Sequence, residues 1–408
     1  MTTESQTCLI IGASHAGAQL ATTLRKEGWE GKILVIGDED ILPYHRPPLS
    51  KALMTGEKEP DQLDIIKVTA YEKANVEFKL STRVESIDRD NKQVVLVGGE
   101  TLSYDKLALC TGARVRKLDI PGGDLAGVHY LRTMADAQAI KANVKPGGKA
   151  VIVGGGYIGL ETASSLRKLG MEVSVLEMMG RVLERVTAPE LSDYYTQLHE
   201  GHGVKIHTDA QALALEGSER VEKVVCNNDL SLDADLVIIG IGVIPNIELA
   251  EAAGLEVGNG VIVNDRACTN DPDIVAAGDC TFHPNDLLGF QLRLESVPNA
   301  MEQARTAAAT ICGNDKTYHA LPWFWSDQYD IKLQIAGFNK GYDKVVLRGE
   351  PSSNQFVAWY LKGEQVLAAD CINSGKEFML AKKLLAAKVT ATPEQLADVD
   401  FDLKTLLD

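Results

Sequence analysis

The sequence predicts an α/β protein with two parallel-sheet βαβ units and a C-terminal α+β segment. Three features carry this prediction: two glycine-rich strand-to-helix turns far apart in the chain, several apolar runs that end in glycine, and alternating strands after about residue 322. A chain of 408 residues is too long for one compact core, so we expect two or three domains.

The first βαβ unit has an ordered set of signals: a strand, a glycine turn, a helix and a second strand, at residues 8–11, 12–17, 16–26 and 32–36. The turn reads Gly-Ala-Ser-His-Ala-Gly and would bring backbone amides and a helix N-terminus against a pyrophosphate. Ser14 replaces the usual middle glycine, and a tight turn without a ligand is the alternative. Asp38 lies 26 residues after Gly12, where an acid holds a ribose hydroxyl.

The second unit repeats this design, with strand, turn, helix and strand at residues 150–153, 154–159, 158–168 and 172–176. Its turn, Gly-Gly-Gly-Tyr-Ile-Gly, is a complete dinucleotide motif. Glu177 follows 23 residues after Gly154, and a carboxylate there binds a free 2′-hydroxyl and repels a 2′-phosphate. The residue pattern therefore favours NADH over NADPH.

Two such turns indicate two dinucleotides that exchange electrons, and the natural pair is Rossmann-bound FAD and a nicotinamide. The cofactor-binding candidates are Gly12, Ser14, Gly17, Asp38, Gly154, Gly156, Gly159 and Glu177.

Later parts of the chain supply further elements. Apolar runs at 104–113, 236–242 and 273–279 are typical of buried parallel strands. The last ends in Asp279, a further candidate carboxylate, ahead of a helix capped within 295–300; a core strand with an exposed turn is the alternative. The C-terminal segment should contain strands and one helix, at 332–335, 344–347, 355–361, 365–371 and 377–387.

Composition excludes several classes of protein. The chain has 41 Lys and Arg against 57 Asp and Glu, a net charge of -16, which disfavours nucleic acid and anionic membranes as partners. The polar residues 1–5 predict no secretory signal, and the longest apolar stretch, 236–245, is too short to cross a bilayer. We therefore expect a cytoplasmic protein.

Neither cysteines nor histidines indicate a metal. The seven cysteines form no C-x-x-C pair, and glycines interrupt the helix that would align His199 with His202. No metal site is expected.

The segment 44–51 contains two prolines, and Ser50 is expected to cap a short helix that starts with Lys51. A cation is unfavourable at a helix start, so Lys51 is more plausible if a partner such as reduced flavin requires it; a surface lysine is the alternative. We expect the aromatic run 323–325 to pack in the hydrophobic core; the alternative is that these rings line a flat cofactor.

Taken in order, these motifs resemble the FAD-dependent NADH:ferredoxin reductases of bacterial oxygenase systems. The resemblance covers nearly the whole chain and rests on residues 12–17, 46–51, 111–113, 154–161, 240–246, 277–279, 295–300 and 322–328. It implies a glutathione-reductase-like fold with an FAD-binding domain at 1–113 and 246–322, an NAD-binding domain at 114–245 and a C-terminal α+β domain at 323–408.

The resemblance also implies roles for single residues. FAD contacts fall on Ala16, Asp38, Arg46, Lys51, Val84, Thr111, Gly112, Arg132, Asp279 and Val297. NAD contacts fall on Gly156, Ile158, Glu177 and Gly242. The catalytic candidates are Lys51, Glu161, which would meet that lysine and the nicotinamide, and Trp325 beside the isoalloxazine.

The implied activity is hydride transfer from NADH to FAD, followed by single electrons to a small iron–sulfur ferredoxin. Related disulfide and peroxide reductases need a cysteine near the flavin, and residues 38–54 contain none. Arg305 and Lys332 are candidates for docking the ferredoxin. A rubredoxin reductase, an NADH oxidase and a redox sensor like apoptosis-inducing factor are the alternatives, and the acidic balance argues against the last.

Overall fold

The computed structural model describes residues 6–407; residues 1–5, expected to carry no secretory signal, and residue 408 lie outside them. The chain divides into two compact units. Unit 1 comprises Met1–His45, Leu63–Arg114 and Ile244–Trp323, and unit 2 comprises Arg46–Gln62, Val115–Val243 and Phe324–Asp408. Within the described range, no helix has both the length and the hydropathy needed to span a bilayer.

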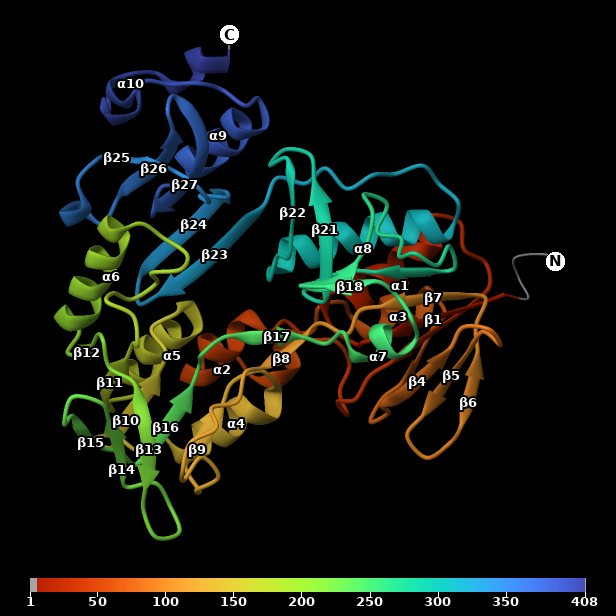
Figure 1. Ribbon diagram of the computed structural model, residues 1–408, viewed down its shortest axis with the longest axis horizontal. Helices are drawn as coiled ribbons and strands as arrows, with labels where there is room; N and C mark the ends of the chain where they lie inside the picture. The colour runs from red at the N-terminus through yellow and green to blue at the C-terminus, as the bar shows by residue number, and fades with distance from the viewer. Residues whose placement is uncertain (1–5, 408) are drawn as a thin grey trace. The chain divides into compact units, whose positions relative to one another are not determined.

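Unit 1 is built on a five-stranded parallel sheet with the order β20-β7-β1-β2-β3 (Figure 1). Its strands are β1 (Thr7–Ile11), β2 (Lys32–Ile36), β3 (Val76–Lys79), β7 (Lys106–Leu109) and β20 (Ile274–Ala276). Helices α1 (His15–Lys26) and α8 (Val297–Ile311) pack against each other in one buried apolar cluster that includes Ile10 and Val35. The strands and helix predicted for the first βαβ unit are confirmed.

Smaller elements complete unit 1. An antiparallel sheet contains β4 (Val84–Asp88), β5 (Gln93–Leu96) and β6 (Thr101–Ser103). A second contains β18 (Val257–Gly258), β19 (Gly260–Ile262), β21 (Thr281–Asn285) and β22 (Phe290–Leu292). The helices are α3 (Val68–Lys73) and α7 (Glu248–Ala252). The chain passes between the units at five points: after His45, within η3 (Pro60–Leu63), β8 (Ala113–Val115) and β17 (Val243–Pro245), and after Trp323.

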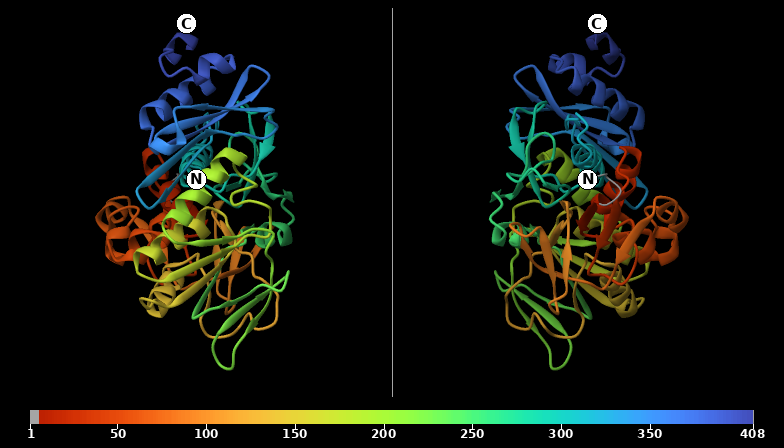
Figure 2. Two further views of the ribbon diagram at one scale, coloured as in Figure 1. Left: turned by 90° about the vertical axis from the view of Figure 1, so that its left-hand side faces the viewer. Right: turned by 90° about the vertical axis from the view of Figure 1, so that its right-hand side faces the viewer.

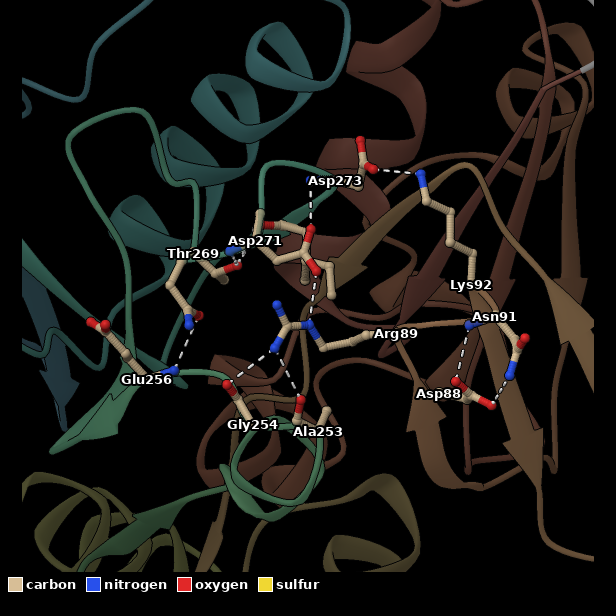
Figure 3. Close-up of polar contacts among 12 residues, drawn as sticks. Asp88, Arg89, Asn91, Lys92, Ala253, Gly254, Glu256, Thr269, Asp271 and Asp273 are labelled. Atoms are coloured by element: carbon tan, nitrogen blue, oxygen red, sulfur yellow. Dashed lines mark hydrogen bonds and ion pairs between the residues drawn. The ribbon is translucent and has the colours of Figure 1, made fainter.

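Arg89 joins three of these segments, as Figure 3 shows. Its Nε donates to Asp271 at 2.8 Å, and its Nη1 donates to the carbonyls of Ala253 and Gly254, which follow α7. A guanidinium is well suited to the carbonyls at the end of a helix, because these carry the negative end of the helix dipole. Arg89 therefore ties α7 to the end of β4 and to the loop before β20.

Unit 2 contains the second five-stranded parallel sheet, with the order β12-β11-β10-β16-β9. Its strands are β9 (Val128–Tyr130), β10 (Lys149–Val153), β11 (Glu172–Leu176), β12 (Lys205–His207) and β16 (Leu236–Ile239). The helices are α4 (Met134–Asn143), α5 (Tyr157–Lys168) and α6 (Pro189–Gly201), with an antiparallel sheet of β13 (Ala212–Glu216), β14 (Lys223–Cys226) and β15 (Ser231–Asp233). The predicted α/β class with two Rossmann-type sheets is confirmed.

The C-terminal segment forms an antiparallel sheet with the order β23-β24-β27-β26-β25. Its strands are β23 (Trp323–Gln328), β24 (Ile331–Gly337), β25 (Lys344–Arg348), β26 (Phe356–Lys362) and β27 (Gln365–Ile372). Helix α9 (Gly375–Ala386) packs on β24 and β27, and Figure 2 shows the helices after β27 gathered on one face of the sheet. The remaining elements are η4 (Pro351–Ser353), α10 (Pro393–Ala397) and η5 (Leu403–Leu407). The α+β character is confirmed, while the three-domain boundaries stay a prediction.

A buried carboxyl group lies inside this sheet. Asp370 of β27 is 1% exposed and accepts hydrogen bonds from Tyr360 at 2.6 Å and from Thr187 at 2.7 Å. Burial raises the pKa of Asp370 to about 6, although both hydrogen bonds act in the opposite direction. The native protein therefore binds a proton here that the unfolded chain releases near its ordinary value of 3.8.

We expect the stability of unit 2 to fall as pH rises from about 4 to about 6, because only the native state holds the Asp370 proton in that window. The loss is complete above the native pKa and amounts to about 3 kcal/mol. Asp370→Asn should remove this pH dependence, which urea midpoints measured across the window would show. The exposed Asp330→Asn is the control; if both variants follow the wild-type profile, Asp370 does not titrate as expected.

Candidate active site

The centre of the candidate site is a partly buried ion pair in unit 2. Lys51 lies between η2 (Pro47–Ser50) and α2 (Ala52–Thr55), and its Nζ is 2.7 Å from Oε1 of Glu161 on α5. Glu161 is 4% exposed. The pairing of Lys51 with Glu161, which the family resemblance implied, is present in the structure. Lys51 is therefore not an unpaired surface lysine, which was the alternative interpretation.

Ser50 does not cap a helix, so that prediction was wrong. Lys51 itself is the N-cap residue of α2 and makes no side-chain capping bond. The Ser50 hydroxyl instead donates to Oε2 of Glu161 at 2.6 Å, and its carbonyl accepts from Ser165 at 2.6 Å. The hydrogen bond from Ser50 to the Glu161 carboxylate is charge-assisted. It is therefore stronger than the bond that the same hydroxyl would form with a neutral backbone amide as a helix cap.

Ser326 supplies the third partner of the carboxylate. Its hydroxyl donates to Oε1 of Glu161 at 2.7 Å, and Ser326 is fully buried. Glu161 thus receives one cation and two hydroxyl donors. The sequence analysis missed both serines as partners of Glu161, because they lie 111 and 165 positions from it and no local pattern links them.

Trp325 lies on β23, next to Ser326. Side chains alternate along a strand, so Trp325 points to the face opposite Phe324 and Ser326. Phe324 packs against Tyr157, with ring centroids 5.1 Å apart. The aromatic run is therefore divided between two faces, with Trp323 and Trp325 on the face opposite Phe324.

The second glycine turn is tightly packed at its ends and open at its middle. A Cβ at Gly154 would lie 2.4 Å from the Gly240 carbonyl, and one at Gly159 would lie 2.1 Å from the Gly154 carbonyl. A Cβ at Gly156 would meet nothing within 4 Å. This is the position where a backbone must admit a pyrophosphate, so the turn fits a dinucleotide. Ile158, in the first turn of α5, is 46% exposed.

Glu177 is held beside this turn. Its Oε2 accepts from the Gly155 amide and its Oε1 from the Met179 amide, both at 2.8 Å. The acid at the end of β11 is therefore fixed against the glycine turn, as a ribose-binding group requires. Gly242, at the end of the β16 strand run, has φ +99° and open space beside it.

The first glycine turn has the same construction in unit 1. A Cβ at Gly12 would lie 2.0 Å from the Cys110 carbonyl, and one at Gly17 would lie 2.0 Å from the Gly12 carbonyl. Ser14 is the N-cap residue of α1, but its side chain makes no capping bond. The substitution at the middle position therefore leaves the tight ends of the turn unchanged.

The other predicted residues of unit 1 lie around this turn or in the core. Gly37 lies close to Ala13, which places the exposed Asp38 beside the turn, and Gly278, before Asp279, lies close to Ala16. Thr111 exchanges two hydrogen bonds with Asn246, and Gly112 follows with φ +63°. The remaining two are Val297, which begins α8, and Val84, which is buried in the core of unit 1.

Arg46 and Arg132 belong to unit 2, where Nη1 of Arg46 donates to the Arg132 carbonyl at 2.6 Å.

The histidines that were considered for a metal are engaged otherwise. His199 is fully buried, and its Nε2 lies 2.8 Å from Oε1 of Gln328. Among residues 6–407, no group of three His, Cys, Asp or Glu side chains could hold a metal ion.

Comparison with known proteins agrees with this geometry. Residues 6–304 match the family profile of the pyridine nucleotide-disulphide oxidoreductases, and residues 323–407 match the reductase C-terminal family. The chain belongs to the pyridine nucleotide-disulphide oxidoreductase family. This oxidoreductase is 42% identical over 405 residues to putidaredoxin reductase of Pseudomonas putida, covering 98% of the chain and 96% of that protein.

Two further relatives of the oxidoreductase are informative. It is 38% identical to rubredoxin-NAD(+) reductase of Pseudomonas putida, over 90% of the chain and 96% of that protein. The solved covalent complex of putidaredoxin reductase with putidaredoxin matches with a TM-score of 0.96 and 42% identity, covering 98% of each chain. The family resemblance and the fold class inferred from the motifs are confirmed.

Proposed function

We propose that this oxidoreductase is an NADH-dependent, FAD-containing ferredoxin reductase that supplies electrons to an oxygenase. One observation carries the proposal: Lys51 is paired with the buried Glu161 in a chain whose segment 38–54 contains no cysteine. Disulfide chemistry needs a thiol near the flavin, so a one-electron protein acceptor is the better candidate. Full-length identity of about 40% to putidaredoxin reductase supports the same acceptor class.

The described residues fit both cofactors. In unit 1, the turn around Gly12 and Gly17 presents the N-terminus of α1, and Asp38 lies beside it. In unit 2, the open space at Gly156 and the fixed carboxylate of Glu177 suit NADH. We assign FAD to the first turn, with Ala16, Arg46, Val84, Thr111, Gly112, Arg132, Asp279 and Val297 as further contacts. We assign NADH to the second, with Gly154, Ile158, Gly159 and Gly242.

FAD, when bound, accepts hydride from NADH and releases the electrons one at a time. The chain's own contribution is orientation and charge. Lys51 presents a cation held by Glu161, and Glu161 presents a carboxylate whose two oxygens are fixed by Ser50 and Ser326. Such a preorganised pair pays no reorganisation cost at the moment of hydride transfer. Trp325 is assigned to the ring face of FAD.

Stopped-flow absorbance tests this function. The purified chain, loaded with FAD, should be bleached by NADH and reoxidised faster by an iron–sulfur ferredoxin than by rubredoxin or oxygen. Rubredoxin is the second candidate acceptor, because a rubredoxin reductase is 38% identical over 90% of the chain. Protein that stays colourless with FAD, or yellow protein that NADH does not bleach, would contradict the proposal.

We propose that Arg305 and Lys332 contribute to docking, since an acidic reductase needs local positive charge to bind an acidic ferredoxin. Arg305 on α8 pairs with Glu302, and Lys332 is an exposed residue of β24. Arg305→Glu should slow electron transfer to ferredoxin about tenfold at low salt and have little effect at high salt. Lys73→Glu, an equal charge change on α3, is the control; equal rates for both variants would exclude Arg305.

We further propose a cytoplasmic location. NADH is a cytoplasmic reductant, and the seven cysteines are all unpaired, as in reducing compartments.

A further inference from the structure

A buried chain of hydrogen bonds leads from Glu161 to helix α6. Ser326 donates to Glu161, the Gln328 Nε2 lies 3.2 Å from the Ser326 hydroxyl, and the His199 Nε2 lies 2.8 Å from Oε1 of Gln328. Ser326, Gln328 and His199 are each at most 1% exposed. The function proposed above gives no role to Gln328 or His199.

Tyr329 forms the outer end of this chain. Its hydroxyl lies 3.1 Å from Nδ1 of His199, its ring stacks on His202 with centroids 3.7 Å apart, and its amide donates to Ser164 at 2.8 Å. Tyr329 also has φ +56°, a left-handed conformation that an aromatic residue rarely adopts. Such strain persists only where the surroundings fix the residue, and these three contacts do so.

The chemistry of the groups gives the chain one direction. The Ser326 hydroxyl has a single proton, which the Glu161 carboxylate must receive because it can only accept. Ser326 then accepts from the Gln328 amide nitrogen, so the Gln328 oxygen faces His199 and needs a donor. With the amide reversed, Ser326 would give its proton to Gln328 and turn a lone pair toward the carboxylate.

The direction of the hydrogen bonds also determines which tautomer His199 adopts. Burial lowers the pKa of His199 to about 4, so the imidazole is neutral at physiological pH and has one N–H. Gln328 requires that N–H on Nε2, which leaves Nδ1 to accept from the Tyr329 hydroxyl. His202, at the end of α6, acts in the same direction on the pKa of His199.

We propose that His199, Gln328 and Ser326 are positioning residues, a directed chain of donors that holds Oε1 of Glu161 in place opposite Lys51. Ser50 holds the other oxygen. In a low-dielectric interior each aligned donor polarises the next, so a distant member of the chain strengthens the last bond. The consequence for NADH oxidation rests on the proposed function, whereas the direction of the chain does not.

Nitrogen-15 NMR of the full-length protein with FAD tests the direction of these hydrogen bonds. At neutral pH we expect the His199 resonances to report a protonated Nε2 and an unprotonated Nδ1, assigned by their loss in His199→Phe. In Ser326→Ala the amide of Gln328 is free to reverse, and the tautomer population should shift toward Nδ1–H. A charged imidazole, or an Nδ1–H tautomer in the wild type, would overturn the proposal.

Stopped-flow reduction by NADH tests the consequence. Gln328→Met and His199→Phe should each lower the limiting rate about tenfold, as expected for a weakened charge-assisted hydrogen bond. The double variant should lose no more than Gln328→Met alone, because the chain is already broken. Tyr194→Phe, which removes a hydrogen bond to Asn354 from the same helix, is the control.

The possible failures are distinguishable. If the wild type is not bleached by NADH, the proposed function fails and the NMR result still decides the direction of the chain. If the wild type is bleached and both single variants match Tyr194→Phe, the positioning role is wrong. Should His199→Phe not fold, Gln328→Met and the NMR experiment decide.

Discussion

Lys51→Met lowers the limiting rate of FAD reduction by NADH about 100-fold, the largest effect we expect in this protein. Methionine keeps the length and apolar stem of the lysine but removes its charge. Glu161, which is 4% exposed, is then left with two hydroxyl donors and no cation. Removing one partner of a buried ion pair costs about 3–5 kcal/mol, so the Glu161 carboxylate should leave the position that it holds in the wild type.

A second lysine offers a matched control. Lys168 pairs with Glu57 on the same unit, but both side chains are more than half exposed, at 64% and 53%. Exposed ion pairs contribute about 0–1 kcal/mol to stability. We therefore expect FAD in the Lys168→Met variant to be reduced by NADH at nearly the wild-type rate. Stopped-flow traces at several NADH concentrations separate the limiting rate from the binding of NADH. If Lys51→Met reacts as fast as Lys168→Met, the buried pair does not support hydride transfer.

Gly156→Ala raises the KM for NADH about 100-fold while the fold stays intact, the second large effect. Its Cβ would meet no protein atom within 4 Å, so nothing in the chain opposes the methyl group. The same space is where the pyrophosphate must approach the backbone, and the methyl group blocks that approach. Circular dichroism should therefore match the wild type, and only the NADH titration should change.

Gly159→Ala provides the contrast. Its Cβ would lie 2.1 Å from the Gly154 carbonyl, a distance that neighbouring atoms cannot accept. We expect this variant to lose the packing of α5 against β10 and to melt at a lower temperature, with or without NADH. If Gly156→Ala binds NADH as tightly as the wild type, the second turn does not hold the pyrophosphate.

Much of the fold could be predicted because its signals are local. The strand over 32–36 and that over 172–176 match β2 and β11, since a buried parallel strand is a continuous apolar run. β23 was not recognised as a strand, because its aromatic and polar residues do not form an apolar run. Short antiparallel strands such as β18, with two residues, carry too little pattern to be predicted.

The residues of the candidate site likewise differ in whether a local pattern identifies them. The turn residues Gly12 and Gly154 and the acid Glu177 could be named from spacing, because each role depends on neighbours in sequence. Lys51 was selected because a cation is unfavourable at a helix start. Its exact partners could not be selected in this way, and Ser50 was predicted to accept from a backbone amide, whereas its hydroxyl donates to Glu161.

The sequence by itself determined the two dinucleotide turns, their acids and the absence of cysteine in segment 38–54, because these are properties of short stretches of chain. The family resemblance implied that Glu161 meets Lys51, and the structure contains that pair. Only the tertiary structure decided that Ser50 and Ser326 donate to Glu161, and that Gln328 and His199 lie behind Ser326. Hydrogen bonds between residues more than 100 positions apart depend on how helices and strands pack, and no residue type or spacing encodes that packing locally.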